Sequence, residues 1–218
     1  MKRRSFLALT TLATAFASME LMTVNRKYGL VERVMKLVCG HPDDIYGPVD
    51  QTSKEFVFEN GDIILTRQHL LTDSVGDAVK WKYIHASIVI GEKNNLLLTE
   101  YSGTEVKRTE TESLKYIIEN PTEYRVVRTR ALKPNPKSSL EYVLETEHTA
   151  PIFDFMSFLG IGPESFKYFT RGTQSPLITC VGFVQNVLFA GGLDITKTIP
   201  IGLTSPDNFI GCYVYKRT

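Results

Sequence analysis

The side chain best suited to covalent chemistry in this chain is Cys180, in the stretch SPLITCVGFVQNVLFAGG. Thr179 is a suitable N-cap and a Gly-Gly pair follows Ala190, so the pattern predicts a helix that begins at Cys180. In a first helical turn, unpaired backbone N–H groups and the helix dipole stabilise a thiolate and can bind an oxyanion. Cys180 is therefore a candidate nucleophile. Buried cysteines also serve as packing residues, and both interpretations are open at this point.

A thiol nucleophile needs a base, and the chain has four histidines, His41, His69, His85 and His148. His85 opens the apolar run HASIVIGE, which predicts a strand whose alternate side chains share a face. A strand end holds an imidazole in a fixed position. The other three histidines lie in polar or turn-rich surroundings, so we predict His85 as the base.

The orienting group predicted for this imidazole is Glu100, in the run NLLLTEYS. The residues around 92–95 form a turn signal between the two runs, which predicts a hairpin. If Ile90 lies opposite Leu96 or Leu97, the two strands bring His85 and Glu100 to the same end of the hairpin. A carboxylate there would hold the imidazole in place. The alternative is a solvated glutamate at a strand end.

Short apolar runs and periodic segments predict the elements that would position these residues. Strands are expected at 61–68, 85–92, 95–102, 124–132 and 209–217, and helices at 20–39, 113–120, 138–148 and from Cys180. Grouped strands with helices before and after them predict an α+β fold. An aromatic-rich stretch from Phe153 to Phe169 is either core or the lining of an acyl groove.

The N-terminus predicts an export signal over residues 1–17. MKRR supplies a positive start, a mildly apolar run follows, and Ala15-Phe16-Ala17 fits a cleavage site. RRSFL is similar to a twin-arginine signal, and the alternatives are an amphipathic helix or a short uncleaved anchor. We expect an exported, periplasmic or envelope protein, with membrane contact only through an uncleaved leader. After this leader we expect two parts. The first is an N-terminal helix and a turn-rich connector over 18–55, and the second is a catalytic domain over 56–218.

Charge and cysteine content limit the other classes of function. A net charge of +1 provides no basic field for nucleic acid, so no nucleic-acid partner is expected. Cys39 and Cys212 are either a disulfide pair or two small buried residues. His41, Asp43 and Asp44 follow Cys39 at a spacing that matches no zinc pattern, so no metal site is predicted.

In order, the motifs GDIIL, YIHASIVIG, LLLTEY and TCVGFV resemble those of the permuted NlpC/P60 superfamily of papain-like proteins. This group includes YiiX- and YaeF-like bacterial enzymes and poxviral relatives, and its permuted branch places the histidine before the cysteine. The resemblance covers residues 56–215. It implies a papain-like α+β fold, in which a small antiparallel sheet or partial barrel packs against the cysteine helix. It also implies that Gly61 and Asp62 are structural.

The resemblance further implies catalytic roles for three residues: Cys180 as nucleophile, His85 as general base and Glu100 as the group that orients it. The expected activity is that of a cysteine peptidase or amidase that acts without a cofactor on a peptide, such as a cell-wall peptide. An acyl hydrolase or acyltransferase acting on lipids or esters is the alternative on the same site. A catalytically silent peptide- or lipid-binding module and a structural envelope or virion protein are the alternatives from other classes.

Overall fold

The chain divides into two compact units, Met1–Pro42 and Asp43–Thr218. All elements described below belong to the second unit. The predicted leader, the predicted helix at 20–39 and most of the aromatic stretch that ends at Phe169 lie outside the described residues. The computed structural model describes residues 41–67, 82–153, 177–195 and 205–217.

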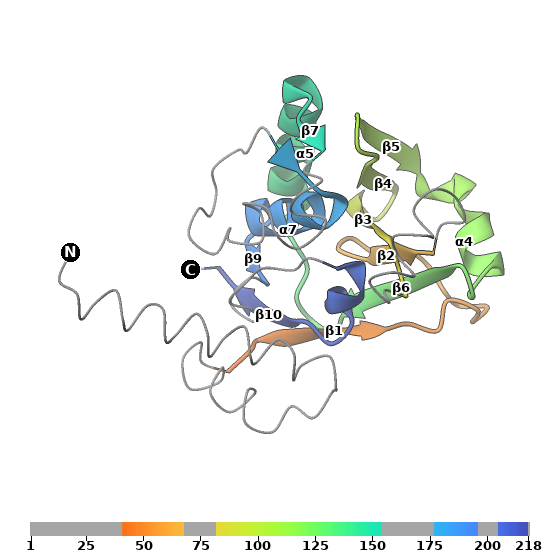
Figure 1. The fold of residues 1–218 in the computed structure, drawn as a ribbon. Coiled ribbons are helices and arrows are strands. Elements are labelled where there is room, and N and C mark those ends of the chain that lie inside the picture. Colours follow the sequence, from red (N-terminus) through yellow and green to blue (C-terminus); the bar gives the residue numbers. More distant parts are fainter. Residues whose placement is uncertain (1–40, 68–81, 154–176, 196–204, 218) are drawn as a thin grey trace, which may run out of the picture. The chain divides into compact units, whose positions relative to one another are not determined.

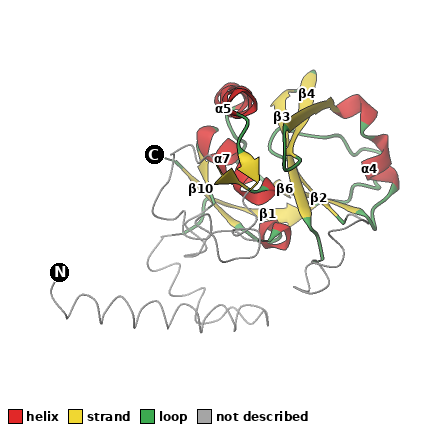
Figure 2. Cartoon of the chain, turned by 45° about the horizontal axis from the view of Figure 1, so that its top comes forward, coloured by secondary structure: helices red, strands yellow, loops and turns green. Residues whose placement is uncertain are grey.

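The largest element is an eight-stranded sheet in which every pair of neighbouring strands is antiparallel. Its strand order is β5-β4-β3-β2-β6-β1-β10-β9. The sheet curls from β4 through β3 and β2 to β6, which gives an antiparallel half-barrel (Figure 2). The strands are β1 (Asp44–Pro48), β2 (Ile63–Thr66), β3 (His85–Glu92), β4 (Asn95–Tyr101), β5 (Val106–Glu110), β6 (Tyr124–Thr129), β9 (Leu193–Asp194) and β10 (Tyr213–Lys216).

Helices lie on both sides of this sheet. The two longest, α5 and α7, pack against each other and against β3, and α4 contacts β6 on the other side (Figure 1). None of the helices in the described ranges has the length and apolar character needed to cross a membrane. The helical elements are η1 (Thr111–Ser113), α4 (Lys115–Glu119), α5 (Pro136–Thr149), α7 (Cys180–Ala190) and η4 (Pro206–Phe209). A separate parallel pair consists of β7 (Ile152–Phe153) and β8 (Leu177–Ile178).

The central strands are buried on both faces. In β2, Ile63 and Leu65 belong to the core cluster beneath α5 and α7, whereas Ile64 belongs to a second cluster with Ile117 of α4. Strands covered on both faces have continuous apolar runs, and this is why β2, β3 and β6 are recognisable in the sequence. The α+β class and the antiparallel sheet predicted from the sequence are confirmed.

Three strands of the sheet have no such signal, and one of them is the two-residue β9. β1 lies inside the segment predicted as a turn-rich connector, yet it pairs with β6 and with β10. Its sequence, DIYGP, contains both residues that normally mark a turn. β5 has only Val106 buried and four exposed polar residues after it, so it lacks an alternating pattern. Residues 44–48 of the predicted connector are therefore a strand of the sheet, whereas residues 49–55 are turn and irregular structure as expected.

A buried ion pair fixes the start of β2. Asp62 is fully buried, and its two carboxylate oxygens accept hydrogen bonds of 2.6 and 2.7 Å from the Arg128 guanidinium of β6. Arg128 also binds the Glu59 carboxylate. Burial raises the pKa of Asp62, and the bonds from Arg128 oppose that rise. The preceding Gly61 has φ of +91°, and a Cβ there would lie 2.6 Å from the Cδ of Pro134, so only glycine fits.

Candidate active site

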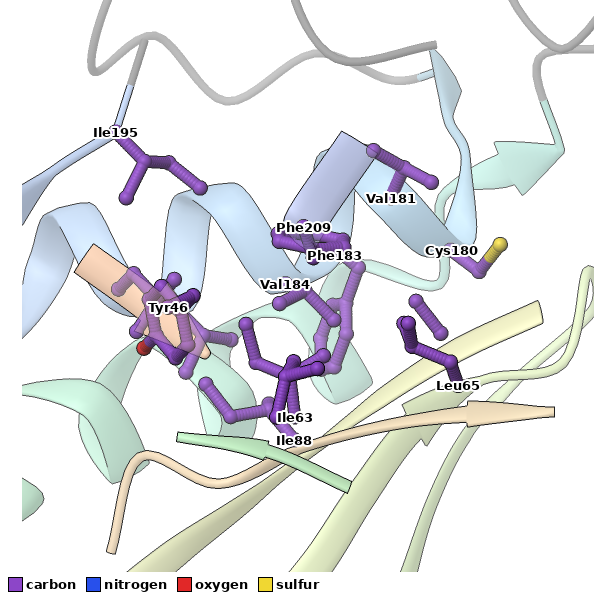
Figure 3. Close-up of a cluster of buried hydrophobic side chains, with 14 of the residues drawn as sticks. Tyr46, Ile63, Leu65, Ile88, Cys180, Val181, Phe183, Val184, Ile195 and Phe209 are labelled. Carbon is purple, nitrogen blue, oxygen red and sulfur yellow. The ribbon is translucent and has the colours of Figure 1, made fainter. Parts of the chain in front are cut away.

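Cys180 is the first residue of α7, as the capping pattern predicts. The Thr179 hydroxyl accepts a hydrogen bond of 2.9 Å from the Gly182 N–H, which fixes the first turn. The thiol residue is only 4% exposed and lies at the margin of the main core cluster. Its sulfur is directed away from Phe183 and Val184 (Figure 3). The first turn of α7 therefore holds a buried sulfur that is turned out of the apolar cluster.

The β3–β4 hairpin supplies the histidine and the glutamate. Its register pairs Ile90 with Leu97, one of the two pairings expected from the sequence. The turn requires Gly91, whose φ is +142° and whose Cβ, if present, would lie 2.1 Å from a backbone oxygen. At the other end of the hairpin, His85 Nε2 and Glu100 Oε2 are 2.9 Å apart. The hairpin thus brings together the two side chains that its register predicts to meet.

The His85 ring lies between the Cys180 thiol and the Glu100 carboxylate. It contacts the Glu100 carboxylate directly, and Cys180 lies close enough for its side chain to raise the pKa of the imidazole. Because Nε2 is used by Glu100, Nδ1 is the ring nitrogen that remains for the sulfur. His85 is the first residue of β3, and Cys180 is the first residue of α7. The start of the strand and the start of the helix therefore meet at the site. The structure therefore brings together all three predicted site residues.

The electrostatics of this group favour a charged imidazole. Burial opposes the imidazolium form, but hydrogen bonds and electrostatic attraction from Cys180 and Glu100 outweigh it and raise the pKa of His85 to about 10. The hydrogen bond from His85 lowers the pKa of Glu100, against the opposing effect of burial. The side chains of His85 and Glu100 are 13% and 29% exposed, so solvent screens their interaction only in part. An imidazolium beside Cys180 is the counter-charge that a thiolate requires.

The other candidate residues lie elsewhere. His41 and His148 are exposed, and His69 is outside the described residues. Asp44 accepts backbone hydrogen bonds from the turn after β6, and Asp43 accepts one from the N–H of β10 residue Lys216. Within the described ranges, no group of three metal-ligating side chains is present.

Cys212 is one of the two cysteines for which the sequence leaves a disulfide or a buried small residue open. It is 5% exposed, and its sulfur is 3.5 Å from the carbonyl oxygen of Tyr213. Cys212 is therefore a buried thiol of the core. Its suggested partner, Cys39, lies outside the described residues.

Sequence reasoning missed Asp207, which binds the backbone just before His85. Its carboxylate accepts hydrogen bonds from the N–H groups of Lys82 and Tyr83. The sequence Ser-Pro-Asp at 205–207 is a recognisable helix start, with a cap residue followed by proline. That pattern predicts the helical turn, but it contains no information about a partner more than a hundred residues earlier.

Comparisons of the chain with protein-family models, with curated proteins and with solved structures give no match. The chemistry of the site is therefore argued from the positions of Cys180, His85 and Glu100.

Proposed function

We propose that this protein is a cysteine peptidase or amidase that cleaves an amide bond through Cys180, His85 and Glu100. We also propose that its half-barrel and cysteine helix form a papain-like fold of the permuted NlpC/P60 type. The observation that carries the proposal is the 2.9 Å contact between His85 Nε2 and Glu100 Oε2, with Cys180 near enough to the same ring to raise its pKa. A thiol, an imidazole and an orienting carboxylate in series are the parts of a nucleophilic site.

In the proposed reaction, His85 holds the proton of Cys180 in a thiolate–imidazolium pair, and the sulfur attacks the carbonyl carbon of the substrate. The backbone N–H of Cys180, at the start of α7, supports the oxyanion that forms. His85 then gives its proton to the departing amine, which leaves a thioacyl enzyme. Water, deprotonated by His85, attacks this thioester and releases a carboxylic acid and the thiol. These steps use no metal and no organic cofactor.

The proposed substrate is a peptide, such as a cell-wall peptide met after export through the N-terminal leader. An ester or lipid acyl group would react by the same steps, with an alcohol as the leaving group. Assays with wall peptides and with acyl esters, each compared with Cys180→Ala, distinguish these two classes. Turnover of peptide amides that the Cys180→Ala variant lacks is the expected result.

The test of the site is the rate at which iodoacetamide alkylates Cys180 between pH 4 and 9, followed by mass spectrometry of the Cys180 peptide. In the wild-type protein we expect fast alkylation well below pH 8.5, which is about the pKa of an ordinary thiol. His85→Ala should abolish this low-pH reactivity. The matched control is His148→Ala, because His148 is exposed on α5 and should leave the rate unchanged.

Slow alkylation of Cys180 that does not depend on His85 would contradict the proposal. The thiol would then be a packing residue, and a binding or structural role would replace the enzymatic one. Following the Cys180 peptide by mass is necessary because Cys212 is a second thiol in the described core.

A further inference from the structure

The short helix η4 (Pro206–Phe209) reaches the chain that leads into the catalytic histidine strand. Ser205 caps it by accepting a hydrogen bond of 3.2 Å from the Asp207 N–H. The Asp207 carboxylate is then directed at another segment. Its Oδ2 accepts a hydrogen bond of 2.7 Å from the N–H of Lys82, and its Oδ1 accepts one of 3.1 Å from the N–H of Tyr83. One carboxylate therefore holds two consecutive backbone groups.

These two groups lie directly before His85. The next residue, Ile84, donates its N–H to the carbonyl oxygen of Thr66 in β2, at 3.1 Å. Three successive N–H groups ahead of His85 are thus bound, two of them by Asp207. The ends of strands fray unless they are held, and His85 is the first residue of its strand. His85 itself pairs with Thr66 of β2, and Asp207 adds a second attachment directly before it.

The other end of η4 packs into the main core cluster. Phe209 is fully buried and belongs to the same core cluster as Cys180. Figure 3 draws Phe209 in the same cluster as Phe183 of α7, and Cys180 lies at the margin of that cluster. A single helical turn thus contributes a side chain to the core cluster that includes Cys180 and binds the segment that leads into the histidine strand. Two residues, Asp207 and Phe209, make these two attachments.

We propose that η4 sets the position of His85 relative to Cys180, with Asp207 as a positioning residue of the site. This inference rests on the proposed function. Asp207 touches neither the substrate nor the reacting atoms in this role. It acts through the backbone of Lys82 and Tyr83, and a displaced His85 would lose its alignment with the sulfur.

The decisive variant is Asp207→Asn, with iodoacetamide alkylation of Cys180 at pH 6 as the first measurement. Asp207 binds Lys82 and Tyr83 through separate oxygens, and an amide replaces one of these oxygens with an NH2 group, so one of the two bonds is lost. Since misplacement by about 1 Å can cost about 100-fold in rate, we expect a fall of about tenfold. The pKa of His85, followed by NMR titration, should fall in the same variant as the ring moves from its partners. Asp207→Glu keeps the charge but displaces the carboxylate, and it should show the same fall.

The matched control is Asp44→Asn. Asp44 is also a carboxylate that binds consecutive backbone N–H groups of a distant segment, those of Ala131 and Leu132, at 2.7 and 2.8 Å. The Asp44→Asn variant should lose unfolding free energy, as Asp207→Asn does, but its Cys180 should be alkylated at the wild-type rate. Phe209→Leu alters the other attachment of η4 and should also slow alkylation, which keeps the test open if Asp207→Asn fails to fold.

The outcomes separate this inference from the proposed function. If wild-type Cys180 is unreactive at low pH, the proposed function itself fails. If the wild type is reactive and the folded Asp207 variants react at the wild-type rate, the positioning role is wrong and the function stands. Equal losses of rate in Asp207→Asn and Asp44→Asn would show a general effect of destabilisation and would also overturn the positioning role.

Discussion

At the scale of single residues, the charge of His85 links the site to the stability of the fold. Its pKa lies well above the value of 6.5 expected for an unfolded histidine. The folded state therefore binds a proton more tightly than the unfolded state does. The resulting stabilisation is fully present below about pH 6.5 and is lost as the pH rises towards about 10.

Glu100→Gln should reduce this pH dependence. The variant removes the carboxylate that helps to raise the pKa of His85, so the free energy of unfolding should fall less steeply between about pH 6.5 and 10. Urea denaturation at several pH values measures this slope. Glu105→Gln is the control, because the Glu105 side chain is 62% exposed and pairs with the exposed Lys107. An unchanged slope in Glu100→Gln would show that the charge of His85 does not depend on Glu100.

The residues of the site differ in how far the sequence predicts them. His85 and Glu100 lie on adjacent strands of one hairpin, so strand alternation and a short turn are enough to bring them together. Cys180 is recognisable from the helix start that surrounds it. Its contact with His85 comes from the packing of α7 against the sheet, and neither propensity nor spacing contains that information. The same holds for Asp207.

At the scale of elements, the first turn of α7 determines where the sulfur lies. Thr179→Ala removes the hydroxyl that accepts the Gly182 N–H, and it should cost about 1 kcal/mol of unfolding free energy. Because the cap fixes the turn that contains Cys180, the alkylation rate should also fall. Thr179→Ser should restore both quantities, as a serine hydroxyl can make the same bond. Denaturation and alkylation of the three proteins test this, and loss of stability without loss of rate would show that the cap does not position the thiol.

The elements that the sequence predicts are those with a buried face on each side or a clear cap. Strands β2, β3, β4 and β6 have apolar runs, and α5 and α7 have caps at Asn135 and Thr179. The strands it misses lack an apolar run: β1 is interior to the sheet but contains Gly47 and Pro48, and β5 is an edge strand. β5 lies at the edge of the sheet and exposes four of its five side chains, so its pairing with β4 leaves no apolar pattern.

At the scale of the whole described unit, the Asp62–Arg128 pair joins strands β2 and β6 to the segment around Glu59. Breaking it by Arg128→Met would leave Asp62 buried without its partner and should cost about 3 kcal/mol of unfolding free energy. The double variant Arg128→Met/Asp62→Leu should recover much of that loss, because no buried charge remains. Chemical denaturation of both variants measures the difference.

The control for this prediction is Arg108→Met, which removes a pair with Glu147 that is well exposed on both sides. Surface pairs of this kind contribute at most about 1 kcal/mol. If Arg108→Met and Arg128→Met cost the same, the buried pair is not a special contributor to the stability of the sheet.

The chain order of the site also bears on how the protein is made. Among the elements that form or support the site, the ribosome synthesises the β3–β4 hairpin first, then α7, and then η4 and β10. A nascent chain thus carries its sulfur before it carries Asp207 and Phe209. If η4 positions His85 as proposed, Cys180 becomes reactive only after η4 has been synthesised and has packed. The growing chain therefore has no reactive thiol until β10 can pair with the sheet.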